Sequence, residues 1–293
     1  MFFGYTMDDF HCNYSLRYSW EPPLRNFRSM TLVCIHLMAN NSYSTEPASK
    51  QTVVHANAHA HNDYYHPRPL LDALDQGFGS VEADVFLVEG ELLVAHSSLE
   101  TRRERTLEKL YLEPLAERCQ ANGGRVYREG PELMLLVDLK SEAEAAYAKL
   151  QEKLVAFESM LTKLVDSKVV VGAVRIVVSG NRPVETMAKQ TSGLAFLDGR
   201  MSDLDSNSPI ELAPVVSDQW SSHFKWRGRD AMPKDEIDKL NALVARAHEQ
   251  KRKLRFWGAP DNPATWEQLA ASGVDLINTD KLQELAEFLA IRK

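Results

Sequence analysis

The stretch Ser80-Val81-Glu82-Ala83-Asp84-Val85-Phe86-Leu87 has the apolar pattern of a buried β-strand, interrupted by two acids. Residues two apart in a strand point to the same face, so Glu82 and Asp84 project together while the valines pack on the opposite face. Two carboxylates at that spacing repel one another unless a cation lies between them, and hard oxygen ligands suit Mg²⁺ or Ca²⁺. The stretch therefore predicts a strand that carries part of a metal site.

Beyond residue 51, short apolar runs alternate with helical patterns. The expected strands are Thr52–His59, Ser80–Leu87, Leu133–Leu139, Val174–Ser179, Leu194–Leu197, Pro214–Ser217, Leu254–Trp257 and Val274–Asn278, with Leu92–Ala95 as an added hairpin strand. The expected helices are Pro69–Gln76, Leu107–Ala121, Glu142–Leu164, Arg182–Gln190, Lys234–Gln250, Ala264–Ala271 and Leu282–Leu289. Eight strands alternating with helices predict an α/β fold, a parallel (β/α)₈ TIM barrel, with an open doubly wound sheet as the alternative.

The chain divides into two regions of different composition. We expect residues 51–293 to form the single barrel domain and residues 1–50 to form an N-terminal extension. In that extension Arg25 and Arg28 precede the apolar run Met30–Ala39, which resembles a signal peptide and is too short to span a bilayer. A functional signal would make the protein secreted or periplasmic, whereas a disordered or loosely docked extension would leave it cytoplasmic.

Composition narrows the range of partners. The net charge of −7 gives no basic surface for a polynucleotide, so no nucleic-acid partner is expected. The three cysteines show no paired spacing and indicate neither a disulfide framework nor a thiolate metal site. We expect a monomer.

Polar residues fall where the expected strands end. Active sites of TIM barrels lie at the carboxyl ends of the strands, and the run Leu135-Leu136-Val137-Asp138-Leu139-Lys140 ends in an acid and a lysine two apart. Asp138 is therefore a candidate third carboxylate of the metal site, and Lys140 a candidate ligand of a bound anion. The alternative for this pair is a helix N-cap followed by a surface lysine.

The order of these residues resembles the superfamily of phosphatidylinositol-phospholipase-C-like phosphodiesterases, which includes glycerophosphodiester phosphodiesterases and the sphingomyelinase D type of phospholipase. The resemblance rests on His61, on Glu82-Ala83-Asp84, on His96 and on Asp138-Leu139-Lys140, and it covers roughly residues 52–290. The segments that resemble most the group named for altered inheritance of mitochondria are 58–64, 66–70, 179–183 and 274–280. In glycerophosphodiester phosphodiesterases Arg-Gly follows the first histidine, whereas His61 is followed by Asn62-Asp63, so their substrate does not carry over.

The resemblance implies a divalent cation and attack on a phosphodiester. Phosphodiester cleavage sets the protein three tasks. It must neutralise charge on the phosphoryl oxygens, remove a proton from the nucleophile and protonate the leaving alkoxide. A cation held by Glu82, Asp84 and Asp138, assisted by Lys140, suits the first task. By resemblance, His61 and His96 divide the other two as general base and general acid, with the assignment left open and a cyclic phosphate as one potential product.

Further residues are predicted to bind substrate. Arg68 and Arg182 each flank a proline near a strand end and can grip a phosphate, although ordinary surface ion pairs explain them equally well. Trp257 can form a wall for a head group or belong to the core. Asn62 and Asn278 complete the expected set of substrate-binding residues.

The expected partner is a small phosphodiester or a lipid head group. Trp220 and Trp226 suggest a loop with peripheral membrane contact, unless that loop simply packs inward. Two other functions remain open: a non-catalytic phospholipid- or phosphate-binding barrel, and an amidohydrolase-type metal hydrolase, for which His59-Ala60-His61 is the typical strand end.

Overall fold

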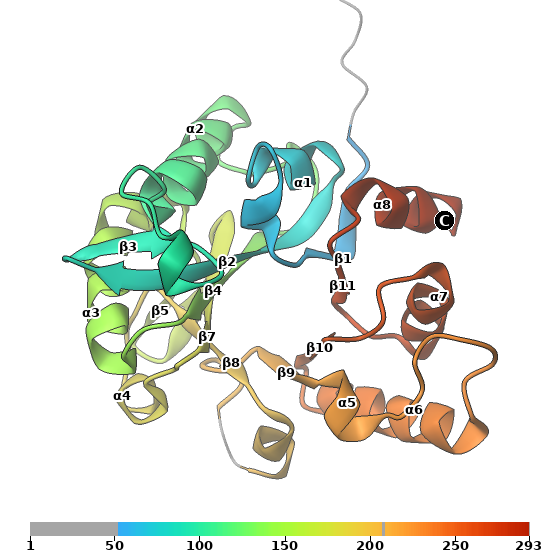
Figure 1. The fold of residues 1–293 in the computed structure, drawn as a ribbon. Helices are drawn as coiled ribbons and strands as arrows, with labels where there is room; N and C mark the ends of the chain where they lie inside the picture. Colours follow the sequence, from blue (N-terminus) through green and yellow to red (C-terminus); the bar gives the residue numbers. More distant parts are fainter. Residues whose placement is uncertain (1–51, 207–208, 293) are drawn as a thin grey trace, which may run out of the picture. The chain divides into compact units, whose positions relative to one another are not determined.

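Eight parallel strands curve into a barrel in the computed structural model, which describes residues 52–206 and 209–292 (Figure 1). The described residues all belong to one compact unit. The barrel strands are β1 (His55–Ala60), β2 (Phe78–Val88), β4 (Leu133–Leu139), β7 (Val174–Gly180), β8 (Phe196–Gly199), β9 (Val215–Gln219), β10 (Lys253–Trp257) and β11 (Ile277–Thr279).

The pairing of the strands confirms the predicted TIM barrel. The order around the sheet is β10-β9-β8-β7-β4-β2-β1-β11, so β1 lies between β2 and β11. A parallel bridge between Arg255 of β10 and Leu276, the residue before β11, joins the two ends of that order. An open doubly wound sheet has two free edges, so this bridge excludes the alternative.

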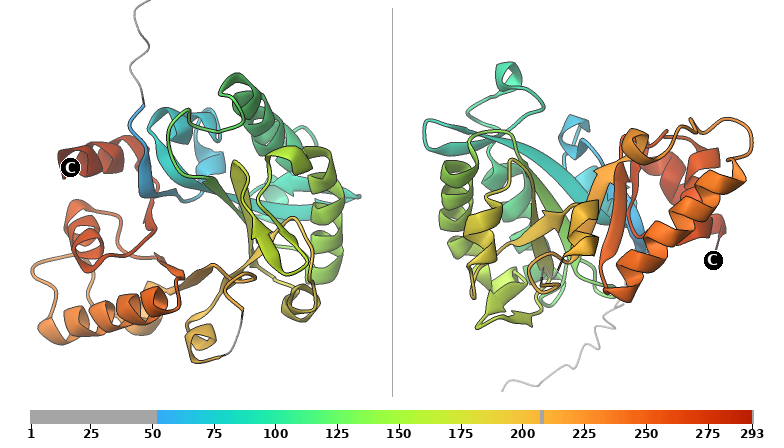
Figure 2. Two further views of the ribbon diagram at one scale, coloured as in Figure 1. Left: turned by 180° about the vertical axis from the view of Figure 1, so that it is seen from behind. Right: turned by 90° about the horizontal axis from the view of Figure 1, so that it is seen from below.

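Helices follow the strands around the outside of the barrel. In Figure 2, α2 and α3 flank β2 and β4, while α6, α7 and α8 cover the opposite side. The helices are α1 (Leu71–Asp75), α2 (Glu113–Ala121), α3 (Ala143–Leu154), α4 (Val184–Ala188), α5 (Trp220–His223), α6 (Lys234–Glu249), α7 (Pro263–Ser272) and α8 (Leu282–Ile291). Short helical turns are η1 (Asp63–Tyr65), η2 (Ser98–Glu100), η3 (Glu108–Leu112), η4 (Val155–Met160) and η5 (Met201–Asp205), of which η3 is a π-helix.

Hydrophobic burial accounts for this arrangement. Strand β4 reads Leu-Met-Leu-Leu-Val-Asp-Leu and is buried on both faces apart from Asp138, as expected for a strand between a barrel interior and a layer of helices. Helix α6 buries Leu240, Leu243, Val244 and Ala247, whose three- and four-residue spacing places them on one stripe.

The structure corrects several of the expected boundaries. The first strand begins at His55 rather than residue 52, and the long helix predicted from residue 142 ends at Leu154. The hairpin of β5 (Lys163–Val165) and β6 (Lys168–Val170) was not predicted, because its first strand continues the apolar spacing of the preceding helix. The hairpin strand β3 (Glu91–Val94) was expected, and it pairs with β2.

Two sequence features suggest membrane contact, the loop with two tryptophans and the signal-like run in the N-terminal extension. The tryptophan loop packs inward, because Trp220 is 1% exposed and Trp226 8% exposed. Within the part of the chain that the structure describes, no helix combines the length and apolarity needed to cross a bilayer. The expected extension over residues 1–50, with its signal-like run, lies outside the described residues.

We predict that Gly79→Ala destabilises the barrel. A Cβ at Gly79 in β2 would lie 2.8 Å from the Cα and 2.9 Å from the carbonyl oxygen of Ala56 in β1, and backbone atoms of a neighbouring strand cannot turn aside. Overpacking of this kind costs about 1–3 kcal/mol. Equilibrium denaturation by urea measures the loss.

The matched control is Gly193→Ala. Its Cβ would meet only the end of the flexible Gln190 side chain, at 3.2 Å, so we expect little change in the free energy of unfolding. Equal stability of the two variants would contradict the close approach of β1 and β2.

Candidate functional site

A cavity of about 450 Å³ opens at the carboxyl ends of the barrel strands. Its lining residues come from all parts of the described chain and are mostly polar: His61, Asn62, Glu82, Asp84, His96, Asp138, Leu139, Lys140, Ser179, Gly180, Asn181, Arg200, Arg255 and Trp257. A larger cavity of about 610 Å³ lies beside β3 and contains none of these residues. We place the candidate site in the smaller cavity, because that is where the strand ends converge.

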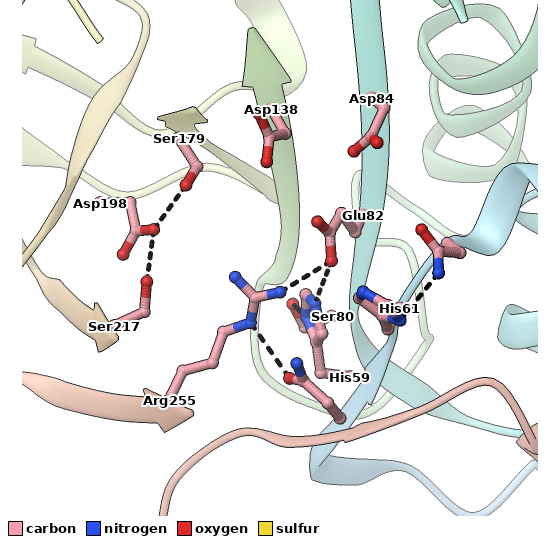
Figure 3. A network of polar contacts seen from close by, with 12 residues as sticks. His59, His61, Ser80, Glu82, Asp84, Asp138, Ser179, Asp198, Ser217 and Arg255 are labelled. Carbon is pink, nitrogen blue, oxygen red and sulfur yellow. Dashed lines mark hydrogen bonds and ion pairs between the residues drawn. The ribbon is translucent and has the colours of Figure 1, made fainter. Parts of the chain in front are cut away.

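Three carboxylates meet at one wall of this cavity. Glu82 and Asp84 share a face of β2, and Asp138 lies directly opposite Asp84 in the register of β2 and β4. One oxygen from each of the three lies within 4.8 Å of the others. In Figure 3 Asp138 lies at the arrowhead of β4, and Glu82 and Asp84 lie on the neighbouring β2, which continues beyond them.

Among the three carboxylates, Glu82 is the one whose negative charge is compensated by neighbouring side chains of the protein. Its Oε2 accepts a hydrogen bond from Nη2 of Arg255 at 2.7 Å and lies 3.2 Å from Nε2 of His59 (Figure 3). Burial alone would raise the pKa of Glu82, but the Arg255 charge and the His59 hydrogen bond hold it well below its usual range. Glu82 is therefore ionised at any ordinary pH.

His59 serves this carboxylate as a neutral donor. Burial, with the charge of Arg255 as the second cause, lowers the pKa of His59 to about 4. Its Nδ1 lies 2.7 Å from the hydroxyl of Ser80, so both ring nitrogens have partners within the protein. Since neither nitrogen is left to bind a metal, the His-x-His pair of an amidohydrolase-type site is not available here.

Asp84 and Asp138 lack such compensation. Burial and the charge of Glu82 raise the pKa of Asp84 to about 6, and burial also raises the pKa of Asp138. Both carboxylates share a single cation, the amine of Lys140, which lies 3.1 Å from an Oδ2 of each. Their Oδ1 atoms are buried without a hydrogen-bond partner.

This donor set fits a divalent cation. Hard cations bind carboxylate oxygens, and the two unpartnered Oδ1 atoms beside Glu82 are acceptors that still require a positive group. Gly180 leaves the space that Asp138 needs, because a Cβ there would lie 1.9 Å from Oδ1 of Asp138. We conclude that the wall formed by Glu82, Asp84 and Asp138 is suited to hold a metal ion.

His61 is oriented by an acid from the last strand end. Its Nδ1 lies 2.8 Å from Oδ1 of Asp280, to which it donates, leaving Nε2 for the cavity. Burial lowers the pKa of His61, but the Asp280 hydrogen bond and the charges of Glu82 and Asp280 outweigh it, and the net pKa is raised. The arrangement is that of an imidazole held and made more basic by a carboxylate.

His96 reaches the same cavity from the hairpin. Its Nδ1 lies 3.0 Å from the hydroxyl of Tyr64 and 3.4 Å from Oδ2 of Asp84. Because Tyr64 has one proton and its closest charged acceptor is Asp84, at 2.8 Å, the phenol oxygen accepts from Nδ1 of His96. Nε2 of His96 is then the nitrogen left for a ligand.

Tyr64 belongs to a loop that is fixed from below. The carboxylate of Asp63 is buried and accepts from the backbone of Leu70 and the hydroxyl of Tyr111, and burial raises the pKa of Asp63 to about 6. Arg105 binds the carbonyl oxygen of Tyr64. These contacts hold η1 in place, and with it the hydroxyl of Tyr64 that contacts His96.

A second polar group occupies the other wall of the cavity mouth. Asp198 in β8 is completely buried, and its Oδ2 accepts from Ser179 of β7 at 2.7 Å and Ser217 of β9 at 2.5 Å. Figure 3 shows these three side chains across the barrel from Glu82 and Asp84. The network joins three neighbouring strands at one level of the barrel interior.

The structure brings together most of the residues predicted from the sequence. His61, His96, Lys140, Asn62, Trp257 and the three carboxylates all line the cavity. Three predicted substrate ligands do not. Arg68 is exposed and paired with Asp72 and Asp75, which matches its ordinary explanation as a surface ion pair.

The other two lie behind the lining. Arg182 donates to the carbonyl oxygen of Asp198, and Asn278 accepts from Nε of Arg255 at 3.1 Å.

Four residues of the site were not singled out from the sequence. Arg255 and Arg200 each stand in or just after an apolar strand, so a charge within such a run was a usable signal. Asp280 falls two residues after the expected last strand, at the end of the segment 274–280 that carries part of the family resemblance. Tyr64 gave no signal, because its role depends on contacts with Asp84 and His96 that are distant in sequence.

Comparison with known proteins places the chain in a family. The AIM6-like phosphodiesterase domain family matches residues 48–198, about half of the chain. Altered inheritance of mitochondria protein 6 of Saccharomyces cerevisiae is 30% identical over 270 residues, covering 76% of this chain and 68% of that protein. The chain belongs to this family. A homolog from Arthroderma benhamiae is 27% identical, with 76% of this chain and 80% of that protein covered.

Other similarities extend to glycerophosphodiester phosphodiesterases. Residues 253–283 match the glycerophosphoryl diester phosphodiesterase family. The solved glycerophosphodiester phosphodiesterase from Agrobacterium tumefaciens aligns with a TM-score of 0.48 at 15% identity, over 80% of this chain and 100% of that one. The enzyme from Parabacteroides distasonis aligns with a TM-score of 0.49 at 13% identity, over 80% and 97%.

We predict that Tyr64→Phe weakens binding of a divalent cation by about tenfold or more, because groups that orient a metal ligand typically contribute that much to affinity. The variant removes the hydroxyl that donates to Asp84. Calorimetric titration with Mn²⁺ measures the effect. Tyr65→Phe is the control, since its hydroxyl contacts only exposed Glu100, and equal affinities in the two variants would contradict this role of Tyr64.

Proposed function

We propose that the protein is a metal-dependent phosphodiester hydrolase that acts on a glycerophosphodiester or a phospholipid head group. The observation that supports the proposal most directly is the meeting of three carboxylates and two differently held histidines in one cavity. The family of the chain agrees with this class of reaction. A cavity of about 450 Å³ suits a small phosphodiester or a head group.

Glu82, Asp84 and Asp138 would hold the cation, Mg²⁺ or Ca²⁺. When bound, such an ion neutralises the charge that develops on the phosphoryl oxygens. Lys140 adds a positive charge at the same wall: burial lowers its pKa, but the charges of Asp138 and Asp84 outweigh burial and raise it, so the amine stays protonated. When a phosphate binds at this wall, it attracts the Lys140 amine away from the carboxylates. The amine then donates a hydrogen bond to a phosphoryl oxygen.

His61 is the residue we assign as general base. Asp280 accepts from Nδ1 and stabilises the imidazolium that forms when Nε2 takes a proton. The attacking group is a water molecule or a hydroxyl of the substrate, and in the second case the first product is a cyclic phosphate.

His96 is the residue we assign as general acid. Its Nδ1 contacts Tyr64 and Asp84, so Nε2 is free to protonate the leaving alkoxide. Asn62 and Trp257 line the same cavity and would contact the alcohol portion of the substrate, Trp257 through a ring that is 37% exposed.

Hydrolysis of bis(p-nitrophenyl) phosphate tests the proposal. We expect activity that EDTA removes and that Mg²⁺, Ca²⁺ or Mn²⁺ restores, and a loss of at least about a hundredfold in His61→Ala, because general acid–base groups contribute about 10²–10⁴-fold. A loss of the same order in His96→Ala is expected on a glycerophosphodiester, because its leaving alkoxide must be protonated whereas p-nitrophenolate leaves without a general acid. His248→Ala is the matched control, since His248 is exposed and paired with Asp275 on the outside of the barrel.

A folded protein that binds the cation and a phosphate but turns over no diester would favour the non-catalytic binding barrel instead. To include substrates that must supply their own hydroxyl, the assay is repeated with a glycerophosphodiester, and the products are separated to detect a cyclic phosphate. Activity that persists in both histidine variants would contradict the assigned mechanism.

We predict that Asp280→Asn moves the acidic limb of the kcat/KM profile to lower pH. A general base works when unprotonated, so activity rises as the pH passes the pKa of His61, which is raised in the wild type with Asp280 as a cause. Removing that carboxylate lowers the pKa, and the limb moves with it, while the maximal rate falls because the imidazolium is less stabilised. An unchanged limb in the variant would assign the base role to another group.

A further inference from the structure

Two guanidinium groups lie beside the buried carboxylate of Asp198, across the barrel mouth from Glu82 and Asp84. Arg200 lines the cavity, and its side chain is 29% exposed. Arg182 donates through Nη1 to the carbonyl oxygen of Asp198. Neither residue is needed for the chemistry proposed above, so this wall has a role still to be assigned.

Arg200 is held rigidly from one side. Its Nη1 donates to the carbonyl oxygen of Asp198 at 3.2 Å, to Oδ2 of Asp198 at 3.1 Å and to the carbonyl oxygen of Gly199 at 3.0 Å. Its backbone nitrogen donates to Asp203, 2.7 Å away. Three acceptors on one nitrogen fix the plane of the guanidinium before any ligand arrives, which reduces the entropy lost on binding.

The remaining donors of this pair have no acceptor. Nε and Nη2 of Arg200 form no hydrogen bond with the described residues, and Nε of Arg182 is buried without a partner. The two cations are close enough that burial, followed by the positive charge of Arg200, lowers the pKa of Arg182. Two neighbouring guanidinium groups with unused N–H donors are matched by a negatively charged group that only accepts hydrogen bonds.

The nearby carboxylates are engaged through their Oδ2 atoms, whereas Oδ1 of Asp198 is buried without a hydrogen-bond partner. Oδ2 of Asp198 accepts from Ser179, Ser217 and Arg200, and Oδ2 of Asp203 accepts from the backbone of Arg200. These acids balance the charge of the two arginines, but Nε and Nη2 of Arg200, a residue that lines the cavity, donate to none of their oxygens. An oxyanion matches the planar fork of a guanidinium in shape and charge.

We propose that Arg200, supported by Arg182, forms a second anion subsite, and that the preferred substrate is a phosphodiester whose alcohol carries another oxyanion, a carboxylate or a phosphomonoester. This inference rests on the proposed function, because it places the reacting phosphate at the metal site formed by Glu82, Asp84 and Asp138. Asp198 acts as a positioning residue that holds Arg200. The neutral or cationic alcohols of other phosphodiesters gain nothing from this subsite.

Binding of an anion without turnover tests the subsite by itself. Inorganic phosphate is titrated calorimetrically into the full-length protein in EDTA, where the uncompensated carboxylates disfavour an anion at the metal wall. We expect Arg200→Gln to weaken phosphate binding by about tenfold or more, since charge-assisted hydrogen bonds contribute on that order. Lys140→Gln, which removes the cation of the metal wall, is expected to change it less. Equal binding by wild type and Arg200→Gln would overturn the proposal.

Kinetics then test the substrate class and distinguish the two anions. kcat/KM is measured for glycerophosphocholine, glycerophosphoserine and a glycerophosphoinositol monophosphate. We expect the last two to exceed the choline diester in the wild type, and the ratio to fall about tenfold in Arg200→Gln but not in Arg103→Gln, whose exposed side chain pairs with Glu89. The larger ratio identifies carboxylate or phosphomonoester as the better ligand, and ratios unaffected by Arg200→Gln would overturn the inference.

Two further results separate the possible failures. Arg200→Lys retains the charge and a hydrogen bond to Asp198 but loses the fork, so it is expected to bind phosphate less well than the wild type and better than Arg200→Gln, provided that all melt at similar temperatures. A protein that hydrolyses no diester yet loses phosphate binding in Arg200→Gln would refute the proposed function and retain the subsite. Hydrolysis with no preference for diesters of anionic alcohols would retain the proposed function and refute the proposed substrate class.

Discussion

Repulsion among three close carboxylates, two buried and one partly buried, is the constraint around which this barrel mouth is built. Glu82, Asp84 and Asp138 lie within a few ångströms of one another, and the protein supplies full compensation to only the first, through Arg255 and His59. The other two share one lysine, and burial, together with the charge of Glu82, raises their pKa values despite it. The charge that the protein omits is the charge that a divalent cation provides.

The same principle of uneven compensation explains the division of the cavity into two walls. On one wall three carboxylates share two permanent cations, Arg255 and Lys140, and on the other Arg200 has donors that no described residue accepts. A ligand with two separated negative groups would satisfy both walls at once, one group through a cation and the other directly. Specificity then arises from the distance between the walls, which the rigid barrel strands set.

The sequence was sufficient for the barrel and for the acidic wall, because both depend on local patterns. Alternating apolar runs defined the strands, and Asp138 and Lys140 fell at the end of one of them. It was insufficient for contacts between distant segments, such as Tyr64 with His96 or Arg255 with Glu82. Arg68 illustrates the limit: its position beside a proline suggested a ligand, whereas Asp72 and Asp75, four and seven residues further along the chain, pair with its charge.

The ion pair between Glu82 and Arg255 also has a consequence for how the chain is completed. The two residues are 173 positions apart, with Glu82 in the second barrel strand and Arg255 in the seventh. A nascent or truncated chain that lacks β10 therefore carries a carboxylate within an apolar strand with no counter-charge. Burial of that strand in such an intermediate carries the desolvation cost of an unpaired charge. The early half of the barrel is therefore disfavoured from closing on itself before the last strands are available.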